Sequence, residues 1–91
     1  KTHKLLYELK KSLVIYSYSI SKNFLKEVFS KANVKFTLTN DLQKASVIIG
    51  LTKHLQQNSN LNQFANEKKI PVYSFDQVSI YQLTKFIKVI T

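Results

Sequence analysis

Short apolar runs separated by amphipathic stretches organise the chain from residue 13 onward. The clearest run, Val-Ile-Ile-Gly at 47–50, is continuous, as expected for a strand that is buried on both faces of a sheet. Another run alternates less regularly and includes the charge of Lys35, which is typical of an edge strand. The pattern predicts four strands, at 13–16, 34–38, 47–50 and 72–74.

Helical spacing of apolar residues fills the stretches between these runs. Apolar residues recur every three or four positions over 21–32, with lysines between them, which predicts an amphipathic helix. A short helical turn is expected at 41–44, and a last helix is expected after Asp76, a candidate N-cap. The residues at core spacing in the third and last helices are Leu61, Phe64, Ala65, Ile80, Leu83, Ile87 and Ile90.

Strands and helices therefore alternate along the chain, in the order β-α-β-α-β-α-β-α. Right-handed crossovers between such units give a mostly parallel sheet with helices on both faces. We expect a small three-layer α/β domain of the Rossmann-like or flavodoxin-like kind, with four strands in the order 2-1-3-4. Residues 13–91 are expected to form this single domain, and residues 1–12 a linker or a short helix from a longer chain.

Composition narrows the classes of function. The 91 residues carry a formal net charge of +9, which indicates an anionic partner such as nucleic acid, an anionic membrane or an acidic protein face. All 14 positive side chains are Lys, and the lack of Arg is typical of an AT-rich genome, so single Lys positions carry less meaning. The chain has no Cys, which excludes disulfides and thiol catalysis, and its two His are too far apart in sequence to favour zinc. No secretory signal is visible, and no apolar run approaches the roughly 20 residues of a membrane helix.

A candidate site is expected at the carboxyl edge of the sheet, where open α/β sheets bind ligands. The loops after the strands place there the hydroxyls of Ser19 and Thr52, the ammonium of Lys53 and the imidazole of His54. Helix N-termini at the same edge favour an anion, so a phosphate fits this place. The chain has one Gly and no Gly-rich phosphate-binding motif, so no bound cofactor is expected. The sequence also predicts no catalytic residue and no metal ligand.

Several segments of the chain together carry a resemblance to a known family, namely 15–22 with Leu25, 38–42, 45–54, Leu61, 70–73 and 77–82. The chain resembles the domain that follows the motor in the sporulation-stage-III-AA-like AAA ATPases of cyanobacteria and plastids, where the ATPase is accompanied by an Arg-x-x-x-His single-stranded nucleic-acid-binding module. Relatives carry a basic residue, a variable residue and then His after the third strand, whereas Lys53 and His54 are adjacent here.

The resemblance implies a C-terminal accessory domain of an ATPase that does not itself hydrolyse ATP. It also implies a location in the plastid (chloroplast) stroma or in the cytoplasm of an AT-rich organism, without secretion, and any oligomer would form through the ATPase portion. The layout of helices and strands is similar to that of kink-turn RNA-binding ribosomal proteins as well, which is the alternative to a Rossmann-like fold.

Three functions remain open from the sequence. The first is a non-catalytic accessory domain that binds single-stranded RNA or DNA through a Lys-rich surface. The second is an interaction module that docks on an acidic protein partner within a larger complex, and the third is a small enzyme or nucleotide sensor that uses the crevice at the sheet edge. The residues predicted to bind nucleic acid or another anion are Ser19, Lys22, Lys26, Thr52, Lys53, His54, Lys68 and Lys69.

Overall fold

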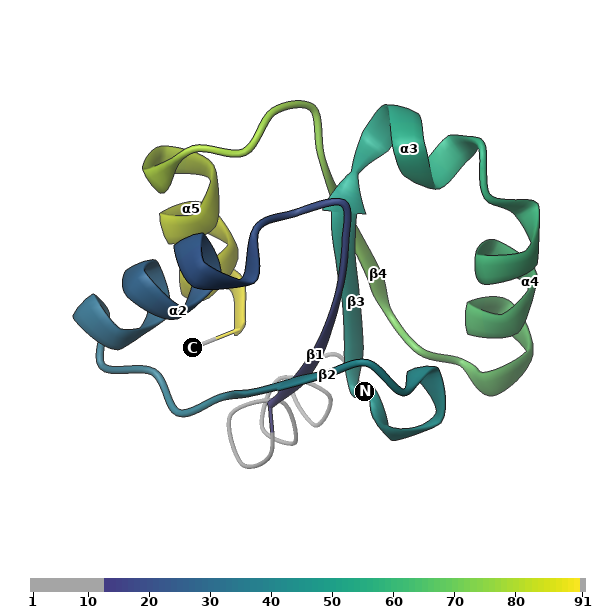
Figure 1. Cartoon of the computed structure of the whole chain (residues 1–91), viewed down its shortest axis with the longest axis horizontal. Helices are drawn as coiled ribbons and strands as arrows, with labels where there is room; N and C mark the ends of the chain where they lie inside the picture. The colour runs from purple at the N-terminus through teal and green to yellow at the C-terminus, as the bar shows by residue number, and fades with distance from the viewer. Residues whose placement is uncertain (1–12, 91) are drawn as a thin grey trace.

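The computed structural model describes residues 13–90, which form a parallel sheet with helices on both faces (Figure 1). The strand order is β2-β1-β3-β4, so the α/β class and the 2-1-3-4 order predicted from the sequence are confirmed. The expectation for residues 1–12 lies outside the described residues. Along the chain, the elements are β1 (Val14–Tyr18), α2 (Lys22–Lys31), β2 (Thr37–Thr39), η1 (Leu42–Lys44), β3 (Val47–Leu51), α3 (Thr52–Gln56), α4 (Ser59–Lys68), β4 (Val72–Phe75) and α5 (Ile80–Ile90).

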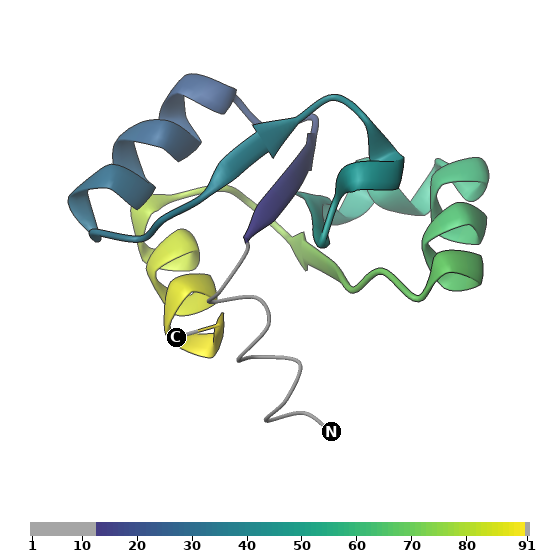
Figure 2. The same ribbon diagram turned by 90° about the horizontal axis from the view of Figure 1, so that it is seen from below.

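The helices form two layers on opposite faces of the sheet, α2 and α5 on one face and α3 and α4 on the other (Figures 1 and 2). The central strand β3 contributes side chains to the cores on both faces of the sheet. Val47 and Ile49 join the core under α2 and α5, whereas Ile48 joins the second core with Leu55 and Leu61. Successive strand side chains point to opposite faces, so a strand covered on both sides must be apolar throughout. This requirement explains the continuous apolar run of β3.

A group of aromatic rings lies within the otherwise aliphatic core under α2 and α5. Phe86 of α5 is fully buried, with its ring centroid 4.8 Å from that of Tyr73, 6.0 Å from that of Phe75 and 6.3 Å from that of Phe29. The sequence pattern did not single out Phe86. It placed Ile80 on the buried stripe instead, and this expectation is wrong, because the Ile80 side chain is 64% exposed and faces the space between α5 and α2.

Two other predicted elements differ from the structure in their bounds or kind. The edge strand is confirmed as β2, but it starts at Thr37, because Val34 and Phe36 pack against the core before the chain joins the sheet. The prediction of a polar loop after β3 is wrong, because α3 begins at Thr52, directly after the strand. This five-residue helix turns Leu55 onto the sheet, where only 4% of its surface is exposed.

The helix caps show how local sequence sets the helix starts. Ser21 Oγ accepts a hydrogen bond of 3.3 Å from the backbone N–H of Phe24, which caps α2. The expected turn at 41–44 is confirmed as η1, with Asp41 as its cap. The predicted cap of the last helix is wrong. Ser79, not Asp76, accepts the 3.2 Å hydrogen bond from Gln82 N, because Ser79 directly precedes the first helical residue.

Candidate functional site

The candidate site lies at the carboxyl edge of the sheet, between β1 and β3. The chain leaves β1 toward α2 on one face of the sheet and leaves β3 toward α3 on the other, so the two connections diverge (Figure 1). A pocket of about 480 Å³ lies at this edge, and we term it the carboxyl-edge groove. Its lining residues are Ser19, Ile20, Ser21, Phe24, Leu51, Lys53, Asp76, Gln77 and Val78.

The loop from β1 to α2 forms one wall of the groove through a tight local turn. The hydroxyl of Ser17 donates a 2.8 Å hydrogen bond to the carbonyl oxygen of Ile20 and closes the turn. Ser19, between them, has φ 66°, in the left-handed region that residues other than Gly seldom occupy. Its side chain is exposed, so the wall presents a hydroxyl to solvent at the rim of the groove.

The helix α3 supplies the opposite wall through Lys53, whose side chain is exposed. Among residues 13–90, the one ion pair joins Lys31 and Glu27, so Lys53 has no carboxylate partner there even though Asp76 lines the same groove. The two other candidates on α3 are half-buried and do not line the groove. One of them, His54, has a buried Nδ1 with no hydrogen-bond partner in the described part of the chain.

The remaining candidate lysines divide between two edges of the sheet. Lys22 Nζ donates a hydrogen bond to Asn40 Oδ1 and so links the start of α2 to the carboxyl end of β2. Lys26 is exposed one turn further along α2. Lys68 and Lys69 end α4 just before β4 begins, which puts them at the amino edge of the parallel sheet.

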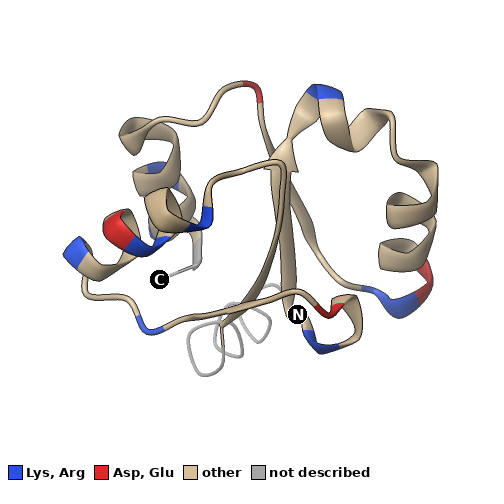
Figure 3. Cartoon of the chain, viewed as in Figure 1, with Lys and Arg blue, Asp and Glu red and all other residues tan. Residues whose placement is uncertain are grey.

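The structure therefore brings only Ser19 and Lys53, of the eight candidates, into one groove. Sequence reasoning missed Gln77 and Val78, which lie in an irregular segment without a motif, and it treated Asp76 as a helix cap. The half-buried ring of Phe24 packs against the core and also reaches the groove. Figure 3 shows the wider charge distribution, in which blue segments occur on both helical layers and at both ends of the sheet.

The described residues form a second polar cavity, but they contain no cluster of metal ligands and no membrane-spanning helix. No three His, Cys, Asp or Glu side chains in residues 13–90 lie close enough together to hold a metal ion. A cavity of about 430 Å³ at the amino edge includes Lys68 and the half-buried ring of Phe64. None of the helices in this part of the chain is long and apolar enough to cross a membrane.

Comparisons with known proteins give one relative and one family. Over 74 residues, the chain is 28% identical to "Uncharacterized protein ycf45" of the red alga Porphyra purpurea. The match covers 81% of this chain and 13% of that protein, so the chain spans a small part of the length of its relative. No solved structure matches.

The family comparison extends further along the chain. The model of a family described as "Phosphotyrosine protein phosphatase" (PTPase) matches residues 13–91, which includes every described strand and helix. The sequence motifs did not point to this family, because they contain no residue pattern of phosphatase chemistry. On the extent of this match, the chain belongs to the phosphotyrosine protein phosphatase (PTPase) family.

Proposed function

We propose that this chain is a non-catalytic accessory domain of a larger, ATPase-type protein, and that it binds single-stranded RNA or DNA at the carboxyl edge of its sheet. The observation that supports this function is the carboxyl-edge groove, where the unpaired ammonium of Lys53 faces the hydroxyl-bearing loop of Ser19 across the switch point. Ligands of open α/β sheets bind at such points. The match covers 13% of the red-algal relative, and this supports the view that the domain is part of a larger protein.

Phosphate chemistry connects the groove with the family description. That description names a phosphorylated substrate, and a nucleic-acid backbone presents phosphate oxygens of the same kind. A Lys ammonium attracts phosphate as a point charge, and hydroxyls donate hydrogen bonds to its oxygens. The ring of Phe24 offers an apolar surface in the same groove, on which a base of a single strand can stack.

The unpaired positive charge favours a polyanion over a single small anion. Apart from Lys31, the lysines of the described residues have no carboxylate within ion-pair distance in that part of the chain. Each Lys that meets a backbone phosphate releases condensed counterions, and this release drives nucleic-acid binding at low salt. A net charge of +9 on 91 residues also speeds the encounter with an anionic strand.

The proposal that the domain is not catalytic rests on its side chains. A phosphoryl-transfer site that works through a thiolate nucleophile needs Cys, and the 91 residues contain none. The groove contains hydroxyls, one ammonium and one carboxylate, but no His lines it to activate a hydroxyl. These groups suit the binding of phosphate better than its transfer.

Binding of fluorescent single-stranded RNA and DNA across a salt series tests the function. We expect affinity to fall by orders of magnitude between about 50 and about 200 mM salt, because several phosphates are contacted. Lys53→Ala should weaken binding to all sequences alike and reduce the slope of log K against log salt by about one. Lys85→Ala is the matched control, because Lys85 lies on α5, stacks over the Tyr81 ring at 5.3 Å and is not part of the groove.

Three outcomes would contradict the proposal in different ways. If no binding occurs at low salt, nucleic acid is not the partner, and the lysines are then expected to bind an acidic protein. A larger loss from the double variant Lys68→Ala/Lys69→Ala than from Lys53→Ala moves the interface to the amino edge. Release of phosphate from a phosphotyrosine peptide by the 91-residue chain contradicts the non-catalytic assignment.

The plastid or cytoplasmic location and the assembly through an ATPase portion stay predictions.

A further inference from the structure

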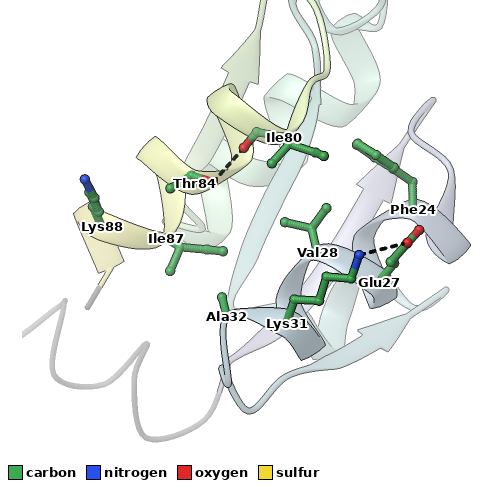
Figure 4. Close-up of a pocket in the computed structure, with 9 residues that line it drawn as sticks. All are labelled: Phe24, Glu27, Val28, Lys31, Ala32, Ile80, Thr84, Ile87 and Lys88. Atoms are coloured by element: carbon green, nitrogen blue, oxygen red, sulfur yellow. Dashed lines mark hydrogen bonds and ion pairs between the residues drawn. The ribbon is translucent and has the colours of Figure 1, made fainter.

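A second concave surface adjoins the carboxyl-edge groove at Phe24 and lies between the two helices of one layer. This surface, which we term the α2–α5 groove, has a volume of about 410 Å³ (Figure 4). Phe24 and Val28 project into it from α2, and Ile80 and Ile87 project into it from α5 (Figure 4). It is therefore apolar along its floor, unlike the hydroxyl-lined site at the sheet edge.

The apolar residues that line this groove are covered to different degrees. Ile80 is 64% exposed and Phe24 is half-buried, whereas Val28 and Ile87 are buried, with 7% and 8% of their surfaces exposed. Tyr81 and Val89 are also exposed on α5, but they do not line the groove. The apolar surface that the groove offers to a partner is therefore that of Ile80 and the ring of Phe24.

The spacing of the lining residues suits a third helix. Positions 24, 28 and 31 on α2 and positions 80, 84 and 87 on α5 repeat every three or four residues, so each helix presents a ridge along the groove. The space between two such ridges accepts the apolar stripe of another helix. With 11 residues, α5 is about 16 Å long, enough for about three turns of a partner helix.

Charge defines the partner further. The two helices that border the groove carry five Lys and one Glu. The single Glu, Glu27, is already paired with Lys31 at 3.3 Å. Of the five Lys, Lys31 and Lys88 line the groove, one on each helix, so its two sides together carry more ammonium than carboxylate. A helix with Asp or Glu on both sides of its apolar stripe complements these flanks, whereas a second copy of this basic chain would be repelled.

We propose that the α2–α5 groove binds an amphipathic helix of a partner protein whose apolar stripe is flanked by acidic residues. The apolar floor provides the buried contact, and the lysines of α2 and α5 select the acidic flanks. This interface does not depend on nucleic-acid binding. Only Phe24 is shared between the two grooves, so variants elsewhere in α5 separate them.

Two designed helical peptides serve as probes for this interface. Both carry the same stripe of Leu and Ile, with Glu flanks in one and Lys flanks in the other, and fluorescence anisotropy measures their binding to the 91-residue chain. The Glu-flanked peptide should bind at least about tenfold more tightly, which corresponds to about 1.4 kcal/mol. Equal binding of the two peptides, or preference for the Lys-flanked one, would overturn the proposal.

Substitutions then locate the binding site. Ile80→Ser should weaken binding of the Glu-flanked peptide by about fivefold or more, because it removes an apolar contact on the wall of the groove. Val89→Ser is the matched control, an exposed apolar residue on the same helix that does not line the groove. An equal effect of the two variants contradicts the assigned site. Sedimentation experiments test the alternative occupant. If the chain forms a stable dimer and Ile80→Ser abolishes that dimer, the groove binds a second copy of this chain and the proposal of a partner helix is wrong.

Discussion

At the scale of single residues, the fold depends on close approach at its central strand. Gly50 pairs with Tyr18 on one side and with Ser74 on the other. A Cβ at position 50 would lie 2.9 Å from the carbonyl oxygen of Tyr18 and 3.0 Å from Cγ of Leu55. The first of these atoms belongs to the backbone of a paired strand and cannot easily move. The only Gly of the chain therefore lets α3 fold back tightly onto the sheet.

Gly50→Ala should destabilise the domain by about 1–3 kcal/mol, because the added methyl group forces β1 or α3 to shift. Urea unfolding followed by circular dichroism measures the change. Ser74→Ala is the matched control, since Ser74 is the β4 partner of Gly50 and its side chain is exposed. A Gly50→Ala variant as stable as the parent chain would show that the close contact relaxes without cost.

At the scale of elements, the hydrophobic pattern predicted what each long segment becomes, but it missed the short helix α3 and the cap of α5. The run at 47–50 and the helical spacing at 21–32 are confirmed as β3 and α2, because both bury apolar side chains at a strict period. The helix α3 escaped prediction, since five residues with one buried Leu55 are too few to show a period. The start of α5 was placed at Asp76, although Ser79 is equally suited to cap a helix.

Ser79→Ala should lower the stability of the domain by about 0.5–2 kcal/mol, because the N–H of Gln82 loses its acceptor at the start of α5. Asp76→Ala should change it much less, since no hydrogen bond to the Asp76 side chain occurs within the described residues. Thermal unfolding of the two variants beside the parent chain makes the comparison. A larger loss of stability from Asp76→Ala than from Ser79→Ala would show that Asp76 caps α5.

At the scale of the whole molecule, topology was predictable and the site only in part. Alternating elements with right-handed crossovers leave few strand orders, so the parallel sheet followed from pattern alone. Chain order also located the carboxyl edge, where Ser19 and Lys53 meet. The position of Lys68 and Lys69 at the amino edge also follows from chain order, because they come just before β4, but the sequence-based prediction grouped them with Ser19 and Lys53.

The charge of the molecule gives a prediction at the same scale. Added sodium chloride should raise the melting temperature, because it screens repulsion among lysines that lack carboxylate partners in the described residues. A gain of about 1 kcal/mol corresponds to about 4–8 °C for a domain of this size. The double variant Lys35→Glu/Lys44→Glu lowers the net charge and should show a weaker salt response in differential scanning calorimetry. A melting temperature that falls with salt would contradict this account.

The aromatic core under α2 also has a consequence for how the domain is made in the cell. Phe29, Phe75 and Phe86 form one group of rings, and Phe86 arrives with α5, the last described element. A ribosome that has released α2 and all four strands has not yet released α5, the second helix that covers this face. The nascent chain therefore exposes Phe29 and Phe75 until α5 emerges. A chain whose translation stops after β4 keeps this apolar surface exposed and is aggregation-prone, so it becomes a substrate of chaperones and proteases.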